Sequence, residues 1–194
     1  MSSPVRSDAA RNRQALIEIA TRLFIAAAPG DEPSMRLIAR EAEVGIGTLY
    51  RHFPTREALV EAVYQDQVRR LTEGADQLLA AHAPARAMRH WMDLFSEWLA
   101  TKNGMVDTLR AMMNSNQLGH SDTRTELLAA IDKILTAGRT ADAIALDVTA
   151  EDIAAALIGI STVAPLTTSR AQAARLMDIF MNGIATATRG ASDR

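Results

Sequence analysis

Helical spacing of apolar residues along almost the whole chain is the feature that most narrows the possible folds. The first apolar segment repeats at intervals of three and four residues, through Leu16, Ile19, Ala20, Leu23 and Phe24. An α-helix turns once in about 3.6 residues, so this spacing places all five on one helical face. The period-two alternation of Val, Ile and Thr that marks strands is missing, while Ala, Leu, Glu and Arg dominate. We therefore expect an all-α fold.

Turn and cap residues divide this pattern into nine predicted helices. Thr123 and Thr149 each stand three residues before an acidic residue, which is the spacing of a capping box. Pro54 and Pro84 fit a helix end and a first helical turn, respectively. The first expected helix ends near Ala28, the second covers 34–42, and the third reaches about Phe53. The fourth starts at Thr55, the fifth starts at Pro84, and the sixth carries Leu109 to Met113. The seventh runs from Thr123 to Gly138, the eighth starts at Thr149, and the ninth runs from about Ser169 to Thr188.

Composition indicates a globular protein without disulfides. Of 194 residues, 48% are apolar and 23% charged, and cysteine is absent. The missing cysteines exclude Cys-based metal sites and fit a reducing compartment, so we expect a cytoplasmic protein. The longest apolar run, 153–160, is far below the roughly 20 residues that span a bilayer. We therefore expect no membrane partner.

The charge distribution is compatible with DNA contact at one end of the chain. Residues 1–56 hold eight Arg and six Asp or Glu, whereas 57–194 hold thirteen Lys or Arg and seventeen Asp or Glu. A basic head on an acidic body suits a protein that touches phosphate at one end only. The difference is small, and chance explains it equally well.

The segment 34–64 has the outline of a helix-turn-helix. Two short predicted helices flank a tight turn at 43–45, and Ile38, Ala39 and Val44 can form the small core between them. The second helix begins with short side chains, which let its backbone approach a DNA groove. In such units the first residues of the second helix meet base edges. The pattern therefore predicts binding to double-stranded DNA.

The sequence IAREAEVGIGTLYRHFPTREAL, 38–59, closely resembles the signature of the TetR (tetracycline repressor) family. The resemblance covers about a third of the chain and implies an all-helical, Ω-shaped homodimer with a variable ligand domain. We accordingly expect a TetR-type DNA-binding domain over 9–69, with its helix-turn-helix at 34–53. A ligand-binding and dimerisation domain would fill 70–194.

The same resemblance implies roles for individual residues. Gly45 stands in the expected DNA-binding segment where the family often has Ser or Thr, so a capping hydroxyl is missing there. Arg56 stands where the family often has Lys and retains the charge. The residues expected to face the major groove are Ile46, Gly47, Thr48 and Leu49. The residues expected to contact phosphates are Ser34, Arg36, Tyr50, His52 and Arg56.

Aromatic and methionine side chains in the C-terminal half have two interpretations. Helical spacing favours ordinary core packing, whereas adaptable Met and aromatic side chains also suit a ligand pocket. The resemblance implies that some pack and some line a cavity for a small apolar inducer. The candidate lining residues are Trp91, Phe95, Trp98, Met105, Leu109, Met112, Met113, Ile134, Leu135 and Ile158. The stretch 141–160 is similar to one TetR subgroup, except that Ala145 replaces a frequent Arg.

The last two predicted helices are apolar on more than one face. One face can pack in the core of the chain, and a symmetric partner can bury the other. A fully buried central helix is the alternative. The residues expected at a homodimer interface are Leu157, Ile160, Leu176, Met177, Phe180 and Ile184.

These patterns together predict a transcriptional repressor that a small apolar ligand releases from a palindromic operator. The alternatives are a constitutive DNA-binding regulator with a filled core, and a helical enzyme with a DNA-binding head. The four histidines never fall at HExxH spacing, and Gly45-Ile46-Gly47 lacks the third glycine of a dinucleotide loop. We therefore expect no enzyme activity, cofactor or metal.

Overall fold

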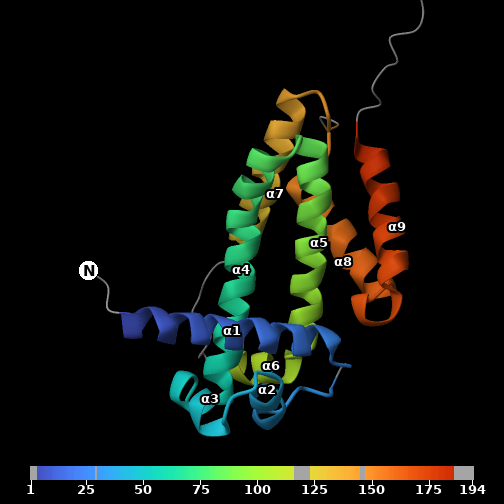
Figure 1. Cartoon of the computed structure of the whole chain (residues 1–194). Coiled ribbons are helices and arrows are strands. Elements are labelled where there is room, and N and C mark those ends of the chain that lie inside the picture. The colour runs from blue at the N-terminus through green and yellow to red at the C-terminus, as the bar shows by residue number, and fades with distance from the viewer. Residues whose placement is uncertain (1–3, 29, 116–122, 145–146, 186–194) are drawn as a thin grey trace, which may run out of the picture. The chain divides into compact units, whose positions relative to one another are not determined.

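The computed structural model describes residues 4–28, 30–115, 123–144 and 147–185, and these ranges contain nine α-helices and no β-strand (Figure 1). The all-α prediction is confirmed. No helix in these ranges is both long and apolar enough to cross a membrane. The helices are α1 Pro4–Ala26, α2 Met35–Glu41, α3 Ile46–His52, α4 Arg56–Ala81, α5 Pro84–Asn103, α6 Val106–Asn114, α7 Thr123–Thr140, α8 Ala150–Val163 and α9 Leu166–Ile184.

Predicted cap residues begin three of these helices. The Ser34 side chain accepts a hydrogen bond from the Leu37 N–H at 3.2 Å, before α2. Thr55 accepts from the Ala58 N–H at 3.1 Å, before α4. At α8 the full capping box forms, because Thr149 accepts from the Asp152 N–H and the Asp152 side chain accepts from the Thr149 N–H. Local hydrogen bonds therefore fix these helix starts.

The last helix differs from its prediction. It begins at Leu166, with Pro165 at the N-cap, and its backbone leaves helical geometry at Ser169 (φ −141°, ψ 34°). The predicted start near Ser169 is therefore wrong, because the structure has a kink inside the helix at that residue. Its expected end at Thr188 lies outside the described residues, as do Ala145 and most of the expected loop at 114–122.

The described chain divides into two compact units. The first contains the described residues of Met1–Gln67 and Trp98–Ser121, so α6 groups with the helix-turn-helix. The second contains those of Val68–Glu97 and Asp122–Arg194. The first dividing point lies near the predicted domain boundary at 69/70, and the predicted domains, 9–69 and 70–194, stay a prediction.

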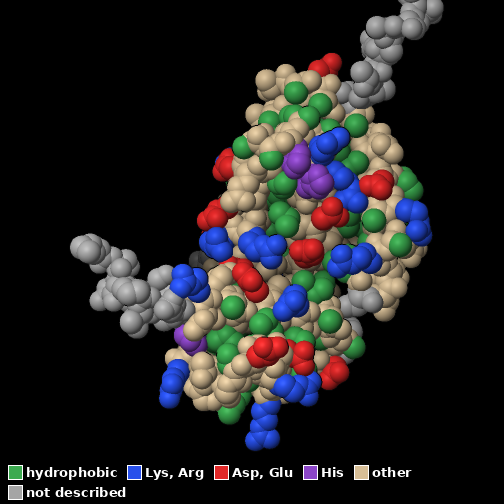
Figure 2. Space-filling view, viewed as in Figure 1, with side chains coloured by type: hydrophobic (Ala, Val, Ile, Leu, Met, Phe, Trp, Pro, Cys, Tyr) green, Lys and Arg blue, Asp and Glu red, His purple; other side chains and the backbone are tan. Residues whose placement is uncertain are grey.

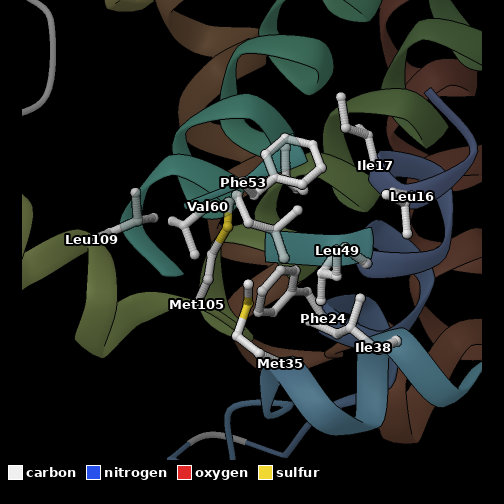
Figure 3. Packing of buried hydrophobic residues seen from close by; sticks show 14 of the residues in the cluster. Leu16, Ile17, Phe24, Met35, Ile38, Leu49, Phe53, Val60, Met105 and Leu109 are labelled. Carbon is white, nitrogen blue, oxygen red and sulfur yellow. The ribbon is translucent and has the colours of Figure 1, made fainter. Parts of the chain in front are cut away.

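One apolar cluster holds the first unit together (Figure 3). Gly104 allows α6 to join it, because a Cβ at this position would lie 1.9 Å from the Phe24 carbonyl oxygen. Any side chain there would push the start of α6 away from the end of α1. The buried cluster residues are Leu16, Ile17, Ala20, Phe24, Met35, Ile38, Ala39, Leu49, Phe53, Leu59, Val60, Val63, Met105, Leu109 and Met112.

The second unit buries its own apolar core. The Trp91 indole N–H donates to the Leu71 carbonyl at 2.9 Å and so joins α5 to α4. Its ring lies 5.5 Å from that of Phe95. At the surface, Arg89 on α5 donates to Asp178 on α9 at 2.6 Å. Other buried residues of this unit are Met88, Met92, Ile131, Ile134, Leu135, Ile153, Leu157 and Met177.

Glu43 allows a test of the backbone geometry of the turn between α2 and α3. Its φ of 54° lies in the left-handed region, which costs an L-residue roughly 1–2 kcal/mol. Glycine is free of that strain but loses more chain entropy on folding. We expect Glu43→Gly to raise the free energy of unfolding by about 0.5–1 kcal/mol, as measured by urea denaturation.

Glu41 supplies the matched control. It is also an exposed acid beside the turn, but it belongs to α2. Glu41→Gly should lower the free energy of unfolding by up to about 1 kcal/mol, because glycine is a poor helix former. Destabilisation by both substitutions would contradict a strained turn at Glu43.

Candidate nucleic-acid interface

A tight turn connects α2 to α3. The Val44 N–H donates to the Ala39 carbonyl at 3.0 Å, and the Glu43 N–H donates to the Arg40 carbonyl at 3.0 Å. Ile38 and Ala39 are buried, and Val44 packs against their cluster, as the sequence predicted. These contacts hold α3 at a fixed angle to α2, which a helix-turn-helix needs to present its second helix.

The side chains of α3 divide into an exposed and a buried set. Ile46 is 40% and Tyr50 46% exposed, and a Cβ on Gly47 would meet nothing within 4 Å. Leu49, in contrast, is fully buried and packs in the same cluster as Phe24 and Ile38 (Figure 3). Its expected position in the major groove is therefore corrected, because its side chain anchors α3 to the core.

Several polar and basic side chains accompany the exposed part of α3. Ser34 and Arg36, at the start of α2, are exposed, and Thr48 and His52 are half-buried. Arg side chains project from the part of the first unit that carries α2 and α3, among Asp and Glu side chains (Figure 2). Gly45 begins α3 without a side-chain cap, as expected from the missing hydroxyl.

Two further arginines of this unit were not among the predicted contacts. Arg51 is exposed in the last turn of α3. Arg13, on α1, stacks its guanidinium 4.9 Å above the Phe53 ring. Arg51 lies inside the helix-turn-helix at 34–53, so its position in the sequence could have identified it as a candidate DNA contact.

Arg56 has all three of its side-chain nitrogens engaged within the protein. Nη2 donates to Glu32 at 2.6 Å, Nη1 to the Pro33 carbonyl at 2.6 Å, and Nε to the Thr108 hydroxyl at 3.0 Å. The Glu32 carboxylate already neutralises its charge, and only 24% of its side chain is exposed. Arg56 is therefore placed differently from the exposed Arg36, although the resemblance gave both the same role.

Glu32 and Thr108 also take part in this site, although no sequence motif indicated them. The Glu32 carboxylate accepts hydrogen bonds from the N–H groups of Asp107 and Thr108 at 2.8 and 3.0 Å, and from the Thr108 hydroxyl at 2.6 Å. Burial acts to raise the pKa of Glu32, but the Thr108 and Arg56 hydrogen bonds and the Arg56 charge lower it below the ordinary value. No local pattern joins residues so far apart in sequence.

The ten predicted pocket residues are divided between the two units. Met105, Leu109 and Met112 pack in the cluster of the first unit, and the buried Trp98 belongs to the same unit. Met113 and Ile158 are 67% and 51% exposed, which corrects their expected place in a closed cavity. Those buried in the second unit are Trp91, Phe95, Ile134 and Leu135.

A groove of about 310 Å³ lies on the second unit, and none of these ten residues lines it. Its polar lining includes an ion pair between Arg69 and Glu73 at 3.1 Å. Arg70, Gly74, Gln77, Leu78 and Leu94 complete the lining.

The predicted dimer residues also separate by exposure. Leu157, Met177 and Ile184 are buried within their own unit, whereas Ile160, Leu176 and Phe180 are half-buried. The large apolar residues that α8 and α9 expose are others, namely Ile158 (51%), Val163 (70%) and Ile179 (66%). The helical pattern identified the apolar helices but not which of their faces is free.

In the part of the chain that the structure describes, the histidines do not gather into a metal-binding site. Among those residues, no three metal-ligating side chains lie close enough together to hold an ion. His82 and His90, however, lie with their rings 4.7 Å apart, a contact that the sequence did not suggest.

Two family models match the chain. The model for bacterial regulatory proteins of the tetR family matches residues 16–63. The model for the SbtR-like transcriptional regulator C-terminal domain matches residues 83–186. The second match alone covers more than half of the chain, so the C-terminal half carries its own family signal.

Known relatives agree with both models. A TetR transcriptional regulator from Streptomyces coelicolor is 38% identical, with a TM-score of 0.79 over 91% of this chain and 99% of that one. A TetR regulatory protein from Mycobacterium vanbaalenii is 33% identical, with a TM-score of 0.71 over 94% and 100%. An HTH-type regulator of Staphylococcus aureus is 44% identical over 66 residues, a match spanning about a third of either chain.

The helix-turn-helix with its exposed α3 side chains thus occurs in a chain whose N-terminal and C-terminal halves both match one family. Two solved TetR-family structures above 30% identity share the fold over more than 90% of this chain. The chain belongs to the TetR family of transcriptional regulators.

Proposed function

We propose that this regulator binds a palindromic DNA operator as a homodimer and acts as a repressor that a small apolar ligand releases. The observation that carries the proposal is the division of α3, which anchors itself through buried Leu49 and exposes Ile46, Gly47 and Tyr50. A recognition helix needs both properties, because base readout requires a fixed helix with accessible side chains.

DNA contact is divided between phosphates and bases. Ser34 and Arg36 at the start of α2, with Tyr50 and His52 on α3, contact phosphates. Ile46, Gly47 and Thr48 enter the major groove, where Ile46 can meet a thymine methyl group and Thr48 a base edge. Arg56 is left out of the phosphate set, since its guanidinium already has three protein partners.

A second copy of the chain covers the exposed face of α8 and α9. Ile158, Val163 and Ile179 are large, apolar and more than half exposed on these two helices. A two-fold axis lets one apolar patch bury its own counterpart. Half-buried Ile160, Leu176 and Phe180 can add to the contact, whereas the buried Leu157, Met177 and Ile184 support it from within.

The ligand binds among the helices of the second unit. Trp91, Phe95, Ile134 and Leu135 supply apolar and aromatic surface there. The Ser161 hydroxyl on α8 is buried and has no hydrogen-bond partner within the described protein, so it can orient a polar group of the ligand. An apolar molecule with one or two hydrogen-bonding groups fits this chemistry.

Arg36→Ala and Thr48→Ala separate phosphate contact from base readout. Arg36→Ala should weaken binding to operator and random DNA alike and lower the salt slope by about one for each phosphate that the protein no longer touches. Thr48→Ala should preserve random-DNA binding and cost roughly 1–3 kcal/mol of operator preference. The measurement is a salt titration on both DNAs, with an operator selected from a random library. A reduced salt slope for Thr48→Ala would place α3 outside the groove.

Ile179→Asp tests the dimer face. A charge at a buried symmetric contact remains unpaired, so this variant should sediment as a monomer near 21.0 kDa where the parent is a dimer. Met113→Asp is the matched control, because Met113 is 67% exposed and Ile179 is 66% exposed. The proposed interface is wrong if Ile179→Asp stays dimeric, or if Met113→Asp dissociates equally.

If a ligand releases the regulator from its operator, ligand and operator must each weaken binding of the other. A compound from an apolar and aromatic panel that raises the melting temperature should weaken operator binding by about 5–150-fold. By linkage, saturating operator DNA should weaken binding of that compound by the same factor. Calorimetry measures both. Thermal stabilisation without any change in operator affinity would instead favour a regulator that does not respond to this ligand.

A further inference from the structure

Glu32, Arg56 and Thr108 form a polar cluster where the starts of three helices of the first unit meet. Glu32 lies before α2, Arg56 is the first residue of α4, and Thr108 is in the first turn of α6. We infer that this cluster is a latch, and that Arg56 is a positioning residue for DNA binding instead of a phosphate contact. The inference rests on the proposed DNA-binding role of the unit.

Glu32 caps α6 from a distant part of the chain. The N-cap residue of α6 is Met105, which offers no side-chain hydrogen bond. The Glu32 carboxylate accepts instead from the N–H groups of Asp107 and Thr108, at 2.8 and 3.0 Å. A carboxylate suits this position, because the first-turn N–H groups lack helical partners and carry partial positive charge. The start of α6 therefore depends on a residue of the segment between α1 and α2.

Arg56 attaches this cap to the helix-turn-helix. Its Nη2 holds Glu32 at 2.6 Å, while Nη1 holds the carbonyl of Pro33, the residue immediately before the α2 cap Ser34. Nε reaches Thr108 at 3.0 Å, and the guanidinium lies 5.9 Å from the Phe24 ring. One planar cation thereby fixes the starts of α2, α4 and α6, a geometry that a lysine cannot reproduce.

The latch gives α6 a route to the DNA-contacting residues. Thr108 donates its hydroxyl to the same Glu32 oxygen that Arg56 holds, so a shift of the α6 start must break or move both contacts. Arg56 would follow Glu32, and with it the Pro33 carbonyl beside Ser34. Glu32 is 13% exposed, so leaving either partner alone carries a desolvation cost. The unit therefore favours one arrangement of α6 relative to α2.

A phosphate contact and a latch predict different effects of substitution. If Arg56 contacts phosphate, Arg56→Gln lowers the salt slope by about one per protomer, Arg56→Lys is tolerated, and Glu32→Gln strengthens binding by removing a negative charge. If Arg56 acts through the latch, Arg56→Lys and Glu32→Gln both weaken operator binding. The salt slope then stays that of the parent, because the same phosphates are still bound.

The experiment measures operator affinity against salt for Arg56→Gln, Arg56→Lys, Glu32→Gln and the double variant Glu32→Gln/Arg56→Gln in the full-length protein. We expect each single variant to weaken operator binding about tenfold, which corresponds to about 1.4 kcal/mol. The double variant should bind the operator no more weakly than the weaker of the two single variants, since each single substitution already breaks the same latch. Glu57→Gln removes an exposed acid in the first turn of α4 and is the control for loss of a negative charge; it should bind the operator at least as tightly as the parent.

Amide hydrogen exchange tests the latch without DNA. In Glu32→Gln the N–H groups of Asp107 and Thr108 should exchange at least several-fold faster than in the parent, while those of α8 keep their rates. Unchanged exchange at Asp107 and Thr108 would overturn the latch even if the protein binds DNA as proposed. Faster exchange in a protein that binds no operator would keep the latch and reject the DNA-binding proposal. A lowered salt slope for Arg56→Gln with intact binding by Glu32→Gln would assign Arg56 to phosphate.

Discussion

Burial of one apolar cluster is the constraint on which the rest of the DNA-binding unit depends. The cluster takes residues from α1, α2, α3, α4 and α6, so the buried face of each helix is covered by the others. Helices of seven residues, such as α2 and α3, are too short to form alone in water. Leu49 and Ile38 therefore define the recognition helix as much as its exposed residues do. Their packing keeps α3 rigid while its other side remains open.

The same packing brings polar groups of distant segments together. Gly104 lets the start of α6 approach the end of α1, where any Cβ would collide with the Phe24 backbone. Once α6 lies there, its free N–H groups need acceptors, and the Glu32 carboxylate supplies them. Arg56 then compensates the partly buried charge of Glu32. The polar cluster is thus a consequence of how tightly the apolar elements pack, and it links α6 to the elements that carry the proposed DNA contacts.

In the second unit, too, neighbouring positions of one helix differ in whether their side chains are buried or exposed. On α8 and α9 one set of apolar residues, including Leu157 and Met177, is buried in the unit, while Ile158 and Ile179 stay exposed one or two positions away. Successive helical residues point about 100° apart, so a single step along the chain changes the role of a side chain. An apolar composition around the helix is what allows one helix to serve both a core and an external contact.

The sequence by itself determined the features that depend on neighbours within about one helical turn. Helical periodicity, the Ser34 and Thr55 caps, the Thr149 capping box and the helix-turn-helix motif were all predictable, because their hydrogen bonds join residues three to five apart. The family followed from the same short motif. Only the tertiary structure decided which side of each helix is free and which charge is paired. Leu49 proved to be core, Met113 and Ile158 proved to be exposed, and Arg56 found partners 24 and 52 residues away. Such contacts depend on how whole helices pack, which no local pattern of residues specifies.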